Sequence, residues 1–433
     1  MKNIVTLLSI TIFSLAFAQT PKDYGKAIVK QLSSKEMAGR GYTNNGLDNA
    51  AKFIANEFQK IGLKKFNNSY FQEFSYPVNV IEDCQLKVNG KELKFGEDYL
   101  VGAMSPTSQG NYKAENFNSA VVDSLYLFED TEPYYKEIDR VSGKAVVFPV
   151  KEFPEKYATN GVYGRDLYKQ MAEAIIENSV TDKVPVVIER SNQNLIHTIA
   201  SKQTKTAFFR ILNNKTDSIR NIEYNIKATF NPEFNTKNVL GYIQGLRSDS
   251  LIFITTHFDH LGQIGNTYFP GANDNASGVA FMLAMAKYYS VKKPKFTTIF
   301  IAFSGEEAGL QGSKYYVEHS PVSLKKIKYL FNFDMVGTGE EGIQIVNSSK
   351  YNKEYKKLSE INIKHSLLKN VKERGESCNS DHCPFYQLGI PSFFTYTLGG
   401  ASYYHDVLDK EETLSLAEFK DVLFLFTKFI DEL

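Results

Sequence analysis

Two adjacent carboxylates follow a strongly apolar run in the segment IFIAFSGEEAGLQGS, residues 299–313. Residues Ile299 to Phe303 are apolar enough to form a fully buried strand, and Glu306 and Glu307 come shortly after its end. Successive side chains of an extended chain point to opposite sides, so the two glutamates cannot share one role. The segment therefore predicts one carboxylate for each of two different tasks at the end of a buried strand.

Other side chains able to bind a metal ion or move a proton follow the ends of further apolar segments or lie in the loop GANDNASG. Taken singly, a His is usually a satisfied polar group, and an Asp after a strand is usually a turn residue or a helix cap. Taken together, charged groups this close to buried strands would repel one another unless they were paired or bound to cations. The candidate residues are His257, Asp259, Asp274, Asp334 and His405.

The elements that must position these residues alternate between strands and helices from Asn238 onward. This alternation predicts an α/β fold, with a mainly parallel mixed sheet flanked by helices, and in such sheets sites form at the carboxyl ends of the strands. Ser277 is predicted to cap the helix that follows GANDNASG. The predicted strands are NVLGYIQG, LIFITTHF, FTTIFIAF, IKYLFNF and PSFFTYT, and the predicted helices are NASGVAFMLAMAKYYS, GSKYYVEHS and residues 414–433.

The segments before Asn238 show a different pattern of predicted helices and strands. Residues 24–63 contain two helical segments around a Gly/Asn-rich link, and residues 70–99 contain short alternating segments with a turn at Asn89-Gly90. The next region mixes short strands, such as GKAVVFPV and KVPVVIE, with a helix near RDLYKQMAEAIIENS, and we interpret it as an inserted smaller α/β domain. The predicted domains are a signal peptide at 1–18, the N-terminal part of the main domain at 19–115, the insertion at 116–234 and the remainder of the main domain, with the candidate residues, at 235–433.

Five ordered motifs in the C-terminal half of the chain resemble those of the co-catalytic zinc exopeptidases of the aminopeptidase Y and glutamate carboxypeptidase type. They are THFDHLG, GANDNASG, FSGEEAGLQGS, FDMVG, and SDHCPF together with GIPSFF and YYHDVLD. The resemblance covers Asn238 to Leu433 and extends to residues 32–63, while SGKAVVF alone is similar to the protease-associated domain of many relatives. It implies an aminopeptidase that hydrolyses N-terminal residues from peptides and binds two zinc ions per chain.

Carried over position by position, the resemblance implies five metal ligands and a general base. Glu306 is implied as the general base, and the preceding acid of the relatives' Gly-Ala-Asp-Asp motif is here the neutral Asn273. The chemistry also fits on its own, because two metal ions about 3.5–4 Å apart lower the pKa of a shared water and polarise a carbonyl group. Imidazole and carboxylate without thiolate suit zinc, and Asp259 is predicted to orient the ring of His257. The implied ligands are Asp274 as the bridge, His257 and Asp334 on one zinc, and Glu307 and His405 on the other.

Two other interpretations stay open at this point. A single-zinc glutaminyl cyclase has a related fold, but that family typically lines its pocket with Trp, and this chain has no Trp and carries Tyr403-Tyr404 beside His405. A catalytically inactive receptor-like module on the same fold would have lost ligands, whereas every ligand position and the base are present here. Tyr403, Tyr404 and Phe394 are candidates to wall a substrate pocket, and the sequence does not separate aminopeptidase from carboxypeptidase or dipeptidase specificity.

The start of the chain, MKNIVTLLSITIFSLAFAQT, combines Lys2, an apolar run and the small-x-small pattern Ala16-Phe17-Ala18. This predicts a signal peptide cleaved after Ala18 and an exported protein, periplasmic or secreted. The run is short for a membrane span, and no later segment is apolar and long enough to form one.

Charge and cysteine content limit the partners and the chemistry. The 50 basic residues nearly balance the 49 acidic ones and no basic block stands out, so we expect peptide substrates and no nucleic-acid partner. Of the three cysteines, Cys378 and Cys383 are able to close a short loop with Cys84 left over, and three free thiols are the alternative. The oligomeric state is not indicated.

Overall fold

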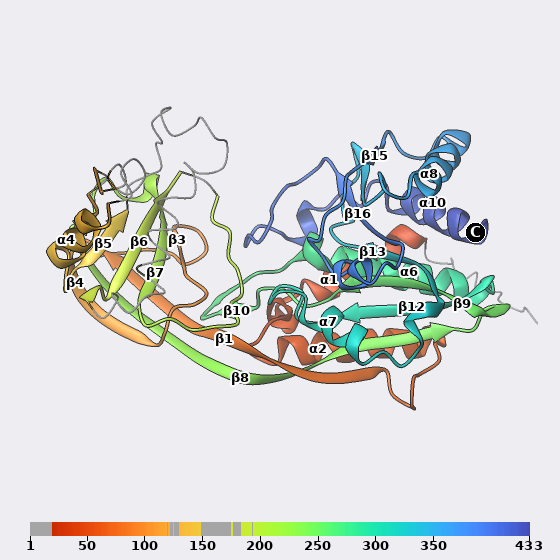
Figure 1. Cartoon of the computed structure of the whole chain (residues 1–433), viewed down its shortest axis with the longest axis horizontal. Coiled ribbons are helices and arrows are strands. Elements are labelled where there is room, and N and C mark those ends of the chain that lie inside the picture. Colours follow the sequence, from red (N-terminus) through yellow and green to blue (C-terminus); the bar gives the residue numbers. More distant parts are fainter. Residues whose placement is uncertain are drawn as a thin grey trace, which may run out of the picture.

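The computed structural model contains a mixed sheet whose strands occur in the order β15-β14-β16-β13-β9-β12-β8 across the catalytic region (Figure 1). The four central strands, from β16 to β12, run parallel to one another, whereas β8 pairs antiparallel with β12 and β14 pairs antiparallel with β16. The predicted α/β fold with a mainly parallel mixed sheet is confirmed. The strands are β8 (Asn221–Ile243), β9 (Arg247–His257), β12 (Phe296–Phe303), β13 (Ile327–Phe333), β14 (Gly342–Val346), β15 (Val371–Glu373) and β16 (Ser392–Leu398).

The structure describes residues 20–118, 120, 121, 124, 130–148, 175, 183–192 and 194–433. The predicted signal peptide lies outside these residues, as does the predicted helix at RDLYKQMAEAIIENS except for Ile175. Among the helices that the structure describes, none combines the length and the apolar character that a membrane span requires.

Helices cover both faces of the central sheet because its strands are apolar on both sides. In β9, Ile252 and Ile254 belong to one core with the long helices, while Leu251 and Phe253 belong to a second core with Tyr316 and Phe385 of two short helices. This alternation follows from the two-residue period of a strand. The long helices are α1 (Pro21–Leu32), α2 (Gly46–Ile61), α6 (Gly278–Val291), α8 (Asn352–His365) and α10 (Phe419–Asp431), and the short ones are α7 (Gln311–Glu318) and α9 (Cys383–Gln387).

Two long strands connect the catalytic region to a second, smaller body of strands (Figure 1). β1 (Phe71–Val88) and β8 pair antiparallel from Phe71 opposite Val239 to Val88 opposite Ile222. The hydrophobic core of the second body includes Ile81 and Tyr99, which precede the predicted boundary at residue 116. The remaining elements of this body are β2 (Lys91–Glu92), β3 (Tyr99–Val101), β4 (Ser108–Asn116), α4 (Glu132–Arg140), β5 (Ala145–Phe148), β6 (Val186–Ser191) and β7 (Ala207–Leu212).

Most of the local elements predicted from the sequence are present, but the predicted helix cap is not. The two N-terminal helices, the turn at Asn89-Gly90 between β1 and β2, and the strands in GKAVVFPV and KVPVVIE are present. The predicted cap at Ser277 is wrong: its hydroxyl donates to the carbonyl oxygen of Asn273, and Asn275 Oδ1 instead accepts from the first backbone N–H of α6, at 2.9 Å. Short elements near the site are η1 (Lys35–Arg40), β10 (Gln263–Ile264), β11 (Thr267–Tyr268) and the π-helical turn η5 (Ala272–Ser277).

Candidate metal centre and active site

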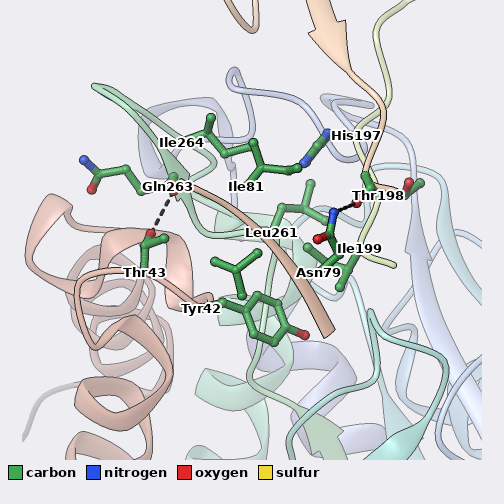
Figure 2. A pocket seen from close by; sticks show the side chains of 12 residues that line it. Tyr42, Thr43, Asn79, Ile81, His197, Thr198, Ile199, Leu261, Gln263 and Ile264 are labelled. Carbon is green, nitrogen blue, oxygen red and sulfur yellow. Dashed lines mark hydrogen bonds between the residues drawn. The ribbon is translucent and has the colours of Figure 1, made fainter. Parts of the chain in front are cut away.

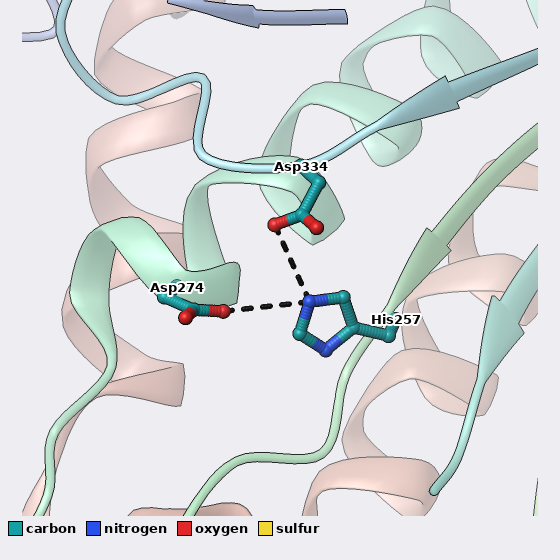
Figure 3. Close-up of side chains that lie close together, drawn as sticks. All are labelled: His257, Asp274 and Asp334. Carbon is teal, nitrogen blue, oxygen red and sulfur yellow. Dashed lines mark ion pairs between the residues drawn. The ribbon is translucent and has the colours of Figure 1, made fainter. Parts of the chain in front are cut away.

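The first group of candidate ligands meets at the carboxyl ends of two adjacent parallel strands. His257 is the last residue of β9 and Asp334 follows β13, while Asp274 lies in η5. His257 Nε2 lies 3.4 Å from Asp274 Oδ1 and 3.3 Å from Asp334 Oδ1 (Figure 3). All three side chains are buried, and they form a group of the kind that holds a metal ion.

A second group forms on the other oxygen of the same aspartate. His405 Nε2 lies 3.3 Å from Asp274 Oδ2 and 3.0 Å from Glu307 Oε2. His260 Nδ1 lies 2.8 Å from Glu307 Oε1, and His260, Asp274 and Glu307 are close enough to share an ion. The two oxygens of Asp274 thus face two different imidazoles, which is the arrangement a bridging ligand needs.

Backbone carbonyl groups orient both histidines. Nδ1 of His257 lies 3.2 Å from the carbonyl oxygen of Asp259, and Nδ1 of His405 lies 2.8 Å from that of His197. Because a carbonyl oxygen only accepts, each Nδ1 carries the proton and each Nε2 is directed to the carboxylates. This is the arrangement in which an imidazole Nε2 binds a metal.

The carboxylates of the site raise the pKa values of the two candidate histidine ligands. Although burial lowers the pKa of His405, the charge of Glu307 raises it to about 11. Burial likewise lowers the pKa of His257, but Asp334 and Glu306 raise it well above its ordinary value. Two buried atoms able to bind a metal, His405 Nε2 and Asp334 Oδ1, form no hydrogen bond with any residue that the structure describes, and their nearest ion-pair neighbours are Glu307 at 3.0 Å and His257 at 3.3 Å, respectively. These residues fit bound cations, because buried polar atoms without a hydrogen bond are otherwise costly.

The two glutamates that follow β12 point in different directions. The carboxylate of Asp259 accepts from the backbone N–H groups of both Glu306 and Glu307, each at 3.2 Å, and its Oδ1 lies 3.7 Å from His257 Nδ1. Glu307 contacts the histidines of the second group, whereas Glu306 lines the pocket in front of the ligands. Burial raises the pKa of Glu306 well above its usual range, and Glu307 adds to this. Burial also favours the neutral form of Glu307, but the charge of His405 lowers its pKa to about 2.

A fully buried arginine and a buried aspartate hold the turn that carries Asp274. Asp409 accepts from the backbone N–H groups of Asn273 and Asp274 at 2.9 Å. The guanidinium of Arg40 donates to five carbonyl oxygens, and its exposure is 0%. Burial lowers the pKa of Arg40 to about 10, while the nearby Asp274 opposes this effect. The five acceptors belong to Leu32, Phe258, Pro270, Gly271 and Asp274.

A loop from the second body packs against the site. Figure 2 shows His197, Thr198 and Ile199 beside Leu261 and Gln263, around a cavity of about 20 Å³ that none of the candidate ligands lines. The buried imidazole of His197 stacks on Phe269 with ring centroids 5.2 Å apart. Through the carbonyl oxygen of His197, the second body therefore helps to orient a candidate metal ligand.

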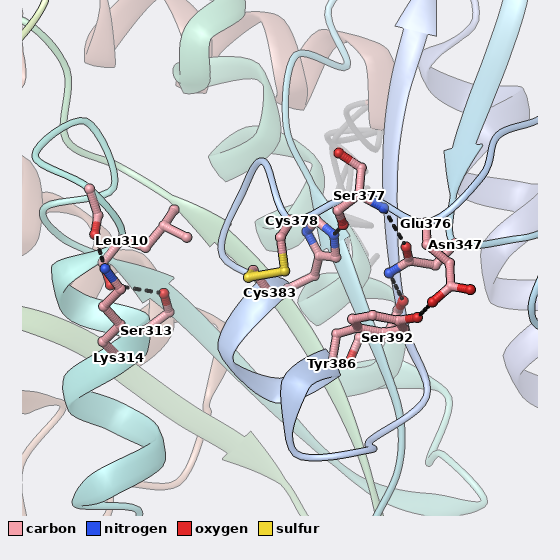
Figure 4. Close-up of a disulfide and its surroundings, with 12 residues drawn as sticks. Leu310, Ser313, Lys314, Asn347, Glu376, Ser377, Cys378, Cys383, Tyr386 and Ser392 are labelled. Atoms are coloured by element: carbon pink, nitrogen blue, oxygen red, sulfur yellow. Dashed lines mark hydrogen bonds between the residues drawn. A yellow bond between two sulfur atoms is a disulfide. The ribbon is translucent and has the colours of Figure 1, made fainter.

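A larger pocket of about 320 Å³ opens directly onto the first group and Glu306. Phe394 and Tyr404 line it as the sequence suggests, whereas Tyr403 does not. A disulfide between Cys378 and Cys383 closes the loop beside the pocket (Figure 4), and Cys84 is free and buried. Ser380 of this loop donates to Asp334 Oδ2 at 3.1 Å. The lining residues are His257, Asp274, Glu306, Asp334, Met335, Arg374, Asn379, Phe394, Tyr396, Tyr404 and His405.

The structure brings all seven residues singled out in the sequence into one site. It also adds residues that the sequence did not reveal, among them Arg40, His260 and Asp409. His260 had a signal, because it stands one residue after Asp259 in THFDHLG. Asp409 ends YYHDVLD and Arg40 lies within residues 32–63, but nothing in the sequence indicated their roles, since they act through backbone groups up to 234 positions away. The tripeptide Asn275-Ala276-Ser277 has the form of a glycosylation sequon, but Asn275 is fully buried and its Nδ2 donates to Thr256.

Comparisons with known proteins agree with this geometry. Residues 238–430 match the model of peptidase family M28. The chain is 33% identical over 162 residues to the aminopeptidase YwaD of Bacillus subtilis, covering 36% of this chain and 34% of YwaD. It is 35% identical over 108 residues to an aminopeptidase of Pseudomonas aeruginosa, covering 25% and 19% of the two chains. These matches span about a third or less of the length of those curated relatives.

Solved structures show the same fold over nearly the whole chain. BSAP, a zinc aminopeptidase from Bacillus subtilis, superposes with a TM-score of 0.70 at 21% identity over 95% of both chains. An aminopeptidase from Aneurinibacillus sp. strain AM-1 gives 0.63 at 19% identity, over 95% of this chain and 93% of the other. The resemblance to the co-catalytic zinc exopeptidases is confirmed to this extent: residues 238–430 match peptidase family M28, and nearly the whole chain shares the fold of the solved aminopeptidases.

Proposed function

We propose that the protein is an exported zinc aminopeptidase that binds two zinc ions per chain. The observation that carries the proposal is the position of Asp274, whose two oxygens face His257 at 3.4 Å and His405 at 3.3 Å. Each of these histidines is paired with its own carboxylate, Asp334 or Glu307. Two similar donor sets around one shared carboxylate suit a pair of metal ions better than a single one.

The donor set supports zinc. All candidate ligands are imidazole nitrogens and carboxylate oxygens, a set that zinc accepts readily. The cysteines supply no thiolate, since Cys84 is buried in another core and the other two form a disulfide. His257 and Asp334 would hold one ion and Glu307 and His405 the other, with Asp274 between them. Relatives described as zinc aminopeptidases support the same metal.

The residues around the pocket support hydrolysis of a terminal peptide bond. When bound, the two zinc ions would lower the pKa of a water and polarise the scissile carbonyl. Glu306, at the pocket wall, takes a proton from the attacking water and delivers it to the leaving amine. Asp259 fixes the backbone of Glu306 and thereby the position of this base. A pocket of about 320 Å³ is within the range of small-ligand sites and suits the end of a peptide.

Export rests on two observations. The N-terminal segment has the order of a signal peptide, with a basic residue, an apolar run and a small-x-small site. The disulfide between Cys378 and Cys383 supports the same proposal, because disulfides persist in oxidising compartments.

The proposal is tested with the purified, zinc-loaded protein and pairs of peptides that differ only in N-acetylation. We expect release of the first residue from free peptides, no release from acetylated ones, and loss of activity after treatment with a chelator. Internal cleavage of an acetylated peptide would contradict the aminopeptidase assignment. Cyclisation of an N-terminal Gln without peptide hydrolysis would instead support the glutaminyl cyclase.

A further inference from the structure

The pocket in front of the candidate metal ligands contains a cation that has no carboxylate partner. Arg374 lines this pocket together with Asn379, Phe394 and Tyr396. Among the residues that the structure describes, the side chain of Arg374 donates one hydrogen bond, from Nη1 to Tyr396 Oη at 2.9 Å, and takes part in no ion pair. A guanidinium carries five N–H donors, so most of its donors remain available to a ligand.

The position of Arg374 is defined by the sheet. Its backbone N–H lies 3.1 Å from both the Ile345 carbonyl oxygen and Ser348 Oγ. It directly follows β15, which pairs in parallel with β14. The guanidinium also lies 5.8 Å from the centre of the Tyr396 ring. The charge is therefore held at the pocket by backbone contacts and by an aromatic ring.

A chain of hydrogen bonds sets the direction of the Tyr396 hydroxyl. Gln344 and Tyr396 stand directly opposite one another on β14 and β16. Gln344 donates through Nε2 to the carbonyl oxygen of Glu373, at 3.4 Å, and its Oε1 accepts from Tyr396 at 2.9 Å. Tyr396 therefore has a lone pair rather than a proton to offer Arg374. This series of hydrogen bonds orients the guanidinium of Arg374 without neutralising its charge.

A substrate carboxylate is a suitable counter-ion for Arg374, because no carboxylate of a described residue forms an ion pair with this guanidinium at the pocket wall. A guanidinium prefers a carboxylate, which it binds through two parallel hydrogen bonds. Phe394 and Tyr404 supply apolar surface in the same pocket for the carbon atoms of a bound residue.

We propose that Arg374 binds a carboxylate of the substrate, so that the enzyme prefers peptides with a carboxylate close to the scissile bond. This inference rests on the proposed aminopeptidase function. The carboxylate has two possible sources, the side chain of an N-terminal Asp or Glu and the C-terminal carboxylate of a dipeptide. Both present the same chemistry to the guanidinium, and the substrates below distinguish them.

The test compares matched substrates with the zinc-loaded enzyme. Glu- and Gln-p-nitroanilide differ only in the side-chain carboxylate, and Leu-Gly and Leu-Gly-amide differ only in the C-terminal one. We expect one of these pairs to favour the carboxylate by about 10- to 100-fold in kcat/KM, because charge-assisted hydrogen bonds discriminate by about that much. The difference should lie mainly in KM, since a side chain that binds substrate without touching the reacting atoms acts chiefly on affinity.

Variants assign the preference to Arg374. We expect Arg374→Gln to reduce the preference to below about threefold, and Arg374→Lys, which keeps the charge without the planar fork, to give an intermediate value. Arg247→Gln is the matched control, because Arg247 begins β9, at the opposite end of that strand from His257, and pairs with Asp249. Zinc content is measured for each variant, so that loss of metal is not mistaken for loss of specificity.

Inhibition of the wild-type enzyme gives the same comparison without any variant. Free glutamate and free glutamine are tested as inhibitors of leucine p-nitroanilide hydrolysis, and N-acetylglycine and its amide extend the comparison to a terminal carboxylate. Equal rates and equal inhibition within every pair would overturn the role of Arg374, as would an equal loss for both members of the preferred pair in Arg374→Gln. Cleavage of leucine p-nitroanilide without a carboxylate preference overturns this inference alone, whereas failure to cleave any of these substrates overturns the proposed function and this inference with it.

Discussion

Replacing Glu306 and Glu307 separately by Gln tests whether adjacent carboxylates have different tasks. Both substitutions replace a carboxyl group by an amide and conserve side-chain volume. The carboxylate of Glu306 forms no hydrogen bond or ion pair with a described residue and lies at the pocket wall. The carboxylate of Glu307 instead lies 2.8 Å from His260 Nδ1 and 3.0 Å from His405 Nε2. The two variants should therefore fail in different ways.

For Glu306→Gln we expect kcat to fall by about 10²–10⁴, the usual cost of losing a general base, because an amide cannot take up and return the proton. Zinc content should stay at two per chain, since this side chain contacts neither histidine group closely. For Glu307→Gln we expect affinity for one zinc to fall by more than about 10–100-fold, because that is the loss caused by changing groups that only support a ligand. Excess zinc should restore part of its activity.

The assay is zinc content by elemental analysis after dialysis, measured beside kcat and KM on one aminoacyl anilide. Glu318→Gln, on the exposed end of the nearby helix α7, is the control for removing a charge. Loss of zinc from Glu306→Gln with full zinc in Glu307→Gln would show that the two roles are reversed. Unchanged kcat in both variants would place the reaction elsewhere.

Two further predictions concern the support of the site and its protonation. Arg40→Met should lower the free energy of unfolding by about 3–5 kcal/mol, because the buried guanidinium donates to five carbonyl oxygens and its loss leaves them unpartnered. Urea titration of this variant and of the control Arg247→Met measures the difference. An equal loss of stability in both variants would refute the prediction. Zinc binding should release about two protons per chain at pH 7, because the pKa of His405 is raised to about 11 and that of His257 well above its ordinary value, while both must be neutral to bind metal. Zinc affinity should therefore increase from pH 6 to pH 8, and calorimetry in buffers of different ionisation enthalpy counts the protons; a pH-independent affinity without proton release would contradict the raised pKa values.

The sequence predicts the central sheet and the principal site residues because both depend on local signals. Strands such as Phe296–Phe303 are buried along their whole length, so they appear in the sequence as nearly continuous apolar segments. Parallel strands end at one edge of the sheet, which places the residues after them together. This is why the positions of His257, Asp334 and Glu306 in the sequence indicate a shared site.

The supporting residues were not predictable because their partners are remote in sequence and belong to the backbone. Arg40 reaches the carbonyl of Asp274, and His197 presents a carbonyl to His405 across 208 positions. Every residue has a backbone carbonyl group, so the residue type does not show which carbonyl groups will accept such a hydrogen bond. The error at Ser277 has a similar origin, since its hydroxyl accepts from the backbone N–H of Val336, 59 positions away, at 2.9 Å rather than from an N–H of the helix.

The extent of the second body was also difficult to infer. β1 and β8 run continuously from the catalytic region into it, so no turn, linker or change of composition marks the passage. A hydrophobic core that uses Ile81 and Leu86 before β4, together with Ile222 and Ile226 of β8, depends on pairing between strands more than 130 positions apart.

The most direct test of the central claim is diffraction from crystals of the active, zinc-loaded protein on both sides of the zinc absorption edge. We predict two anomalous peaks about 3.5–4 Å apart, the separation typical of co-catalytic metal pairs. One should lie between His257 and Asp334 and the other between Glu307 and His405, with Asp274 in contact with both. A single peak, or two peaks that do not share Asp274, would contradict the assignment of a dizinc centre.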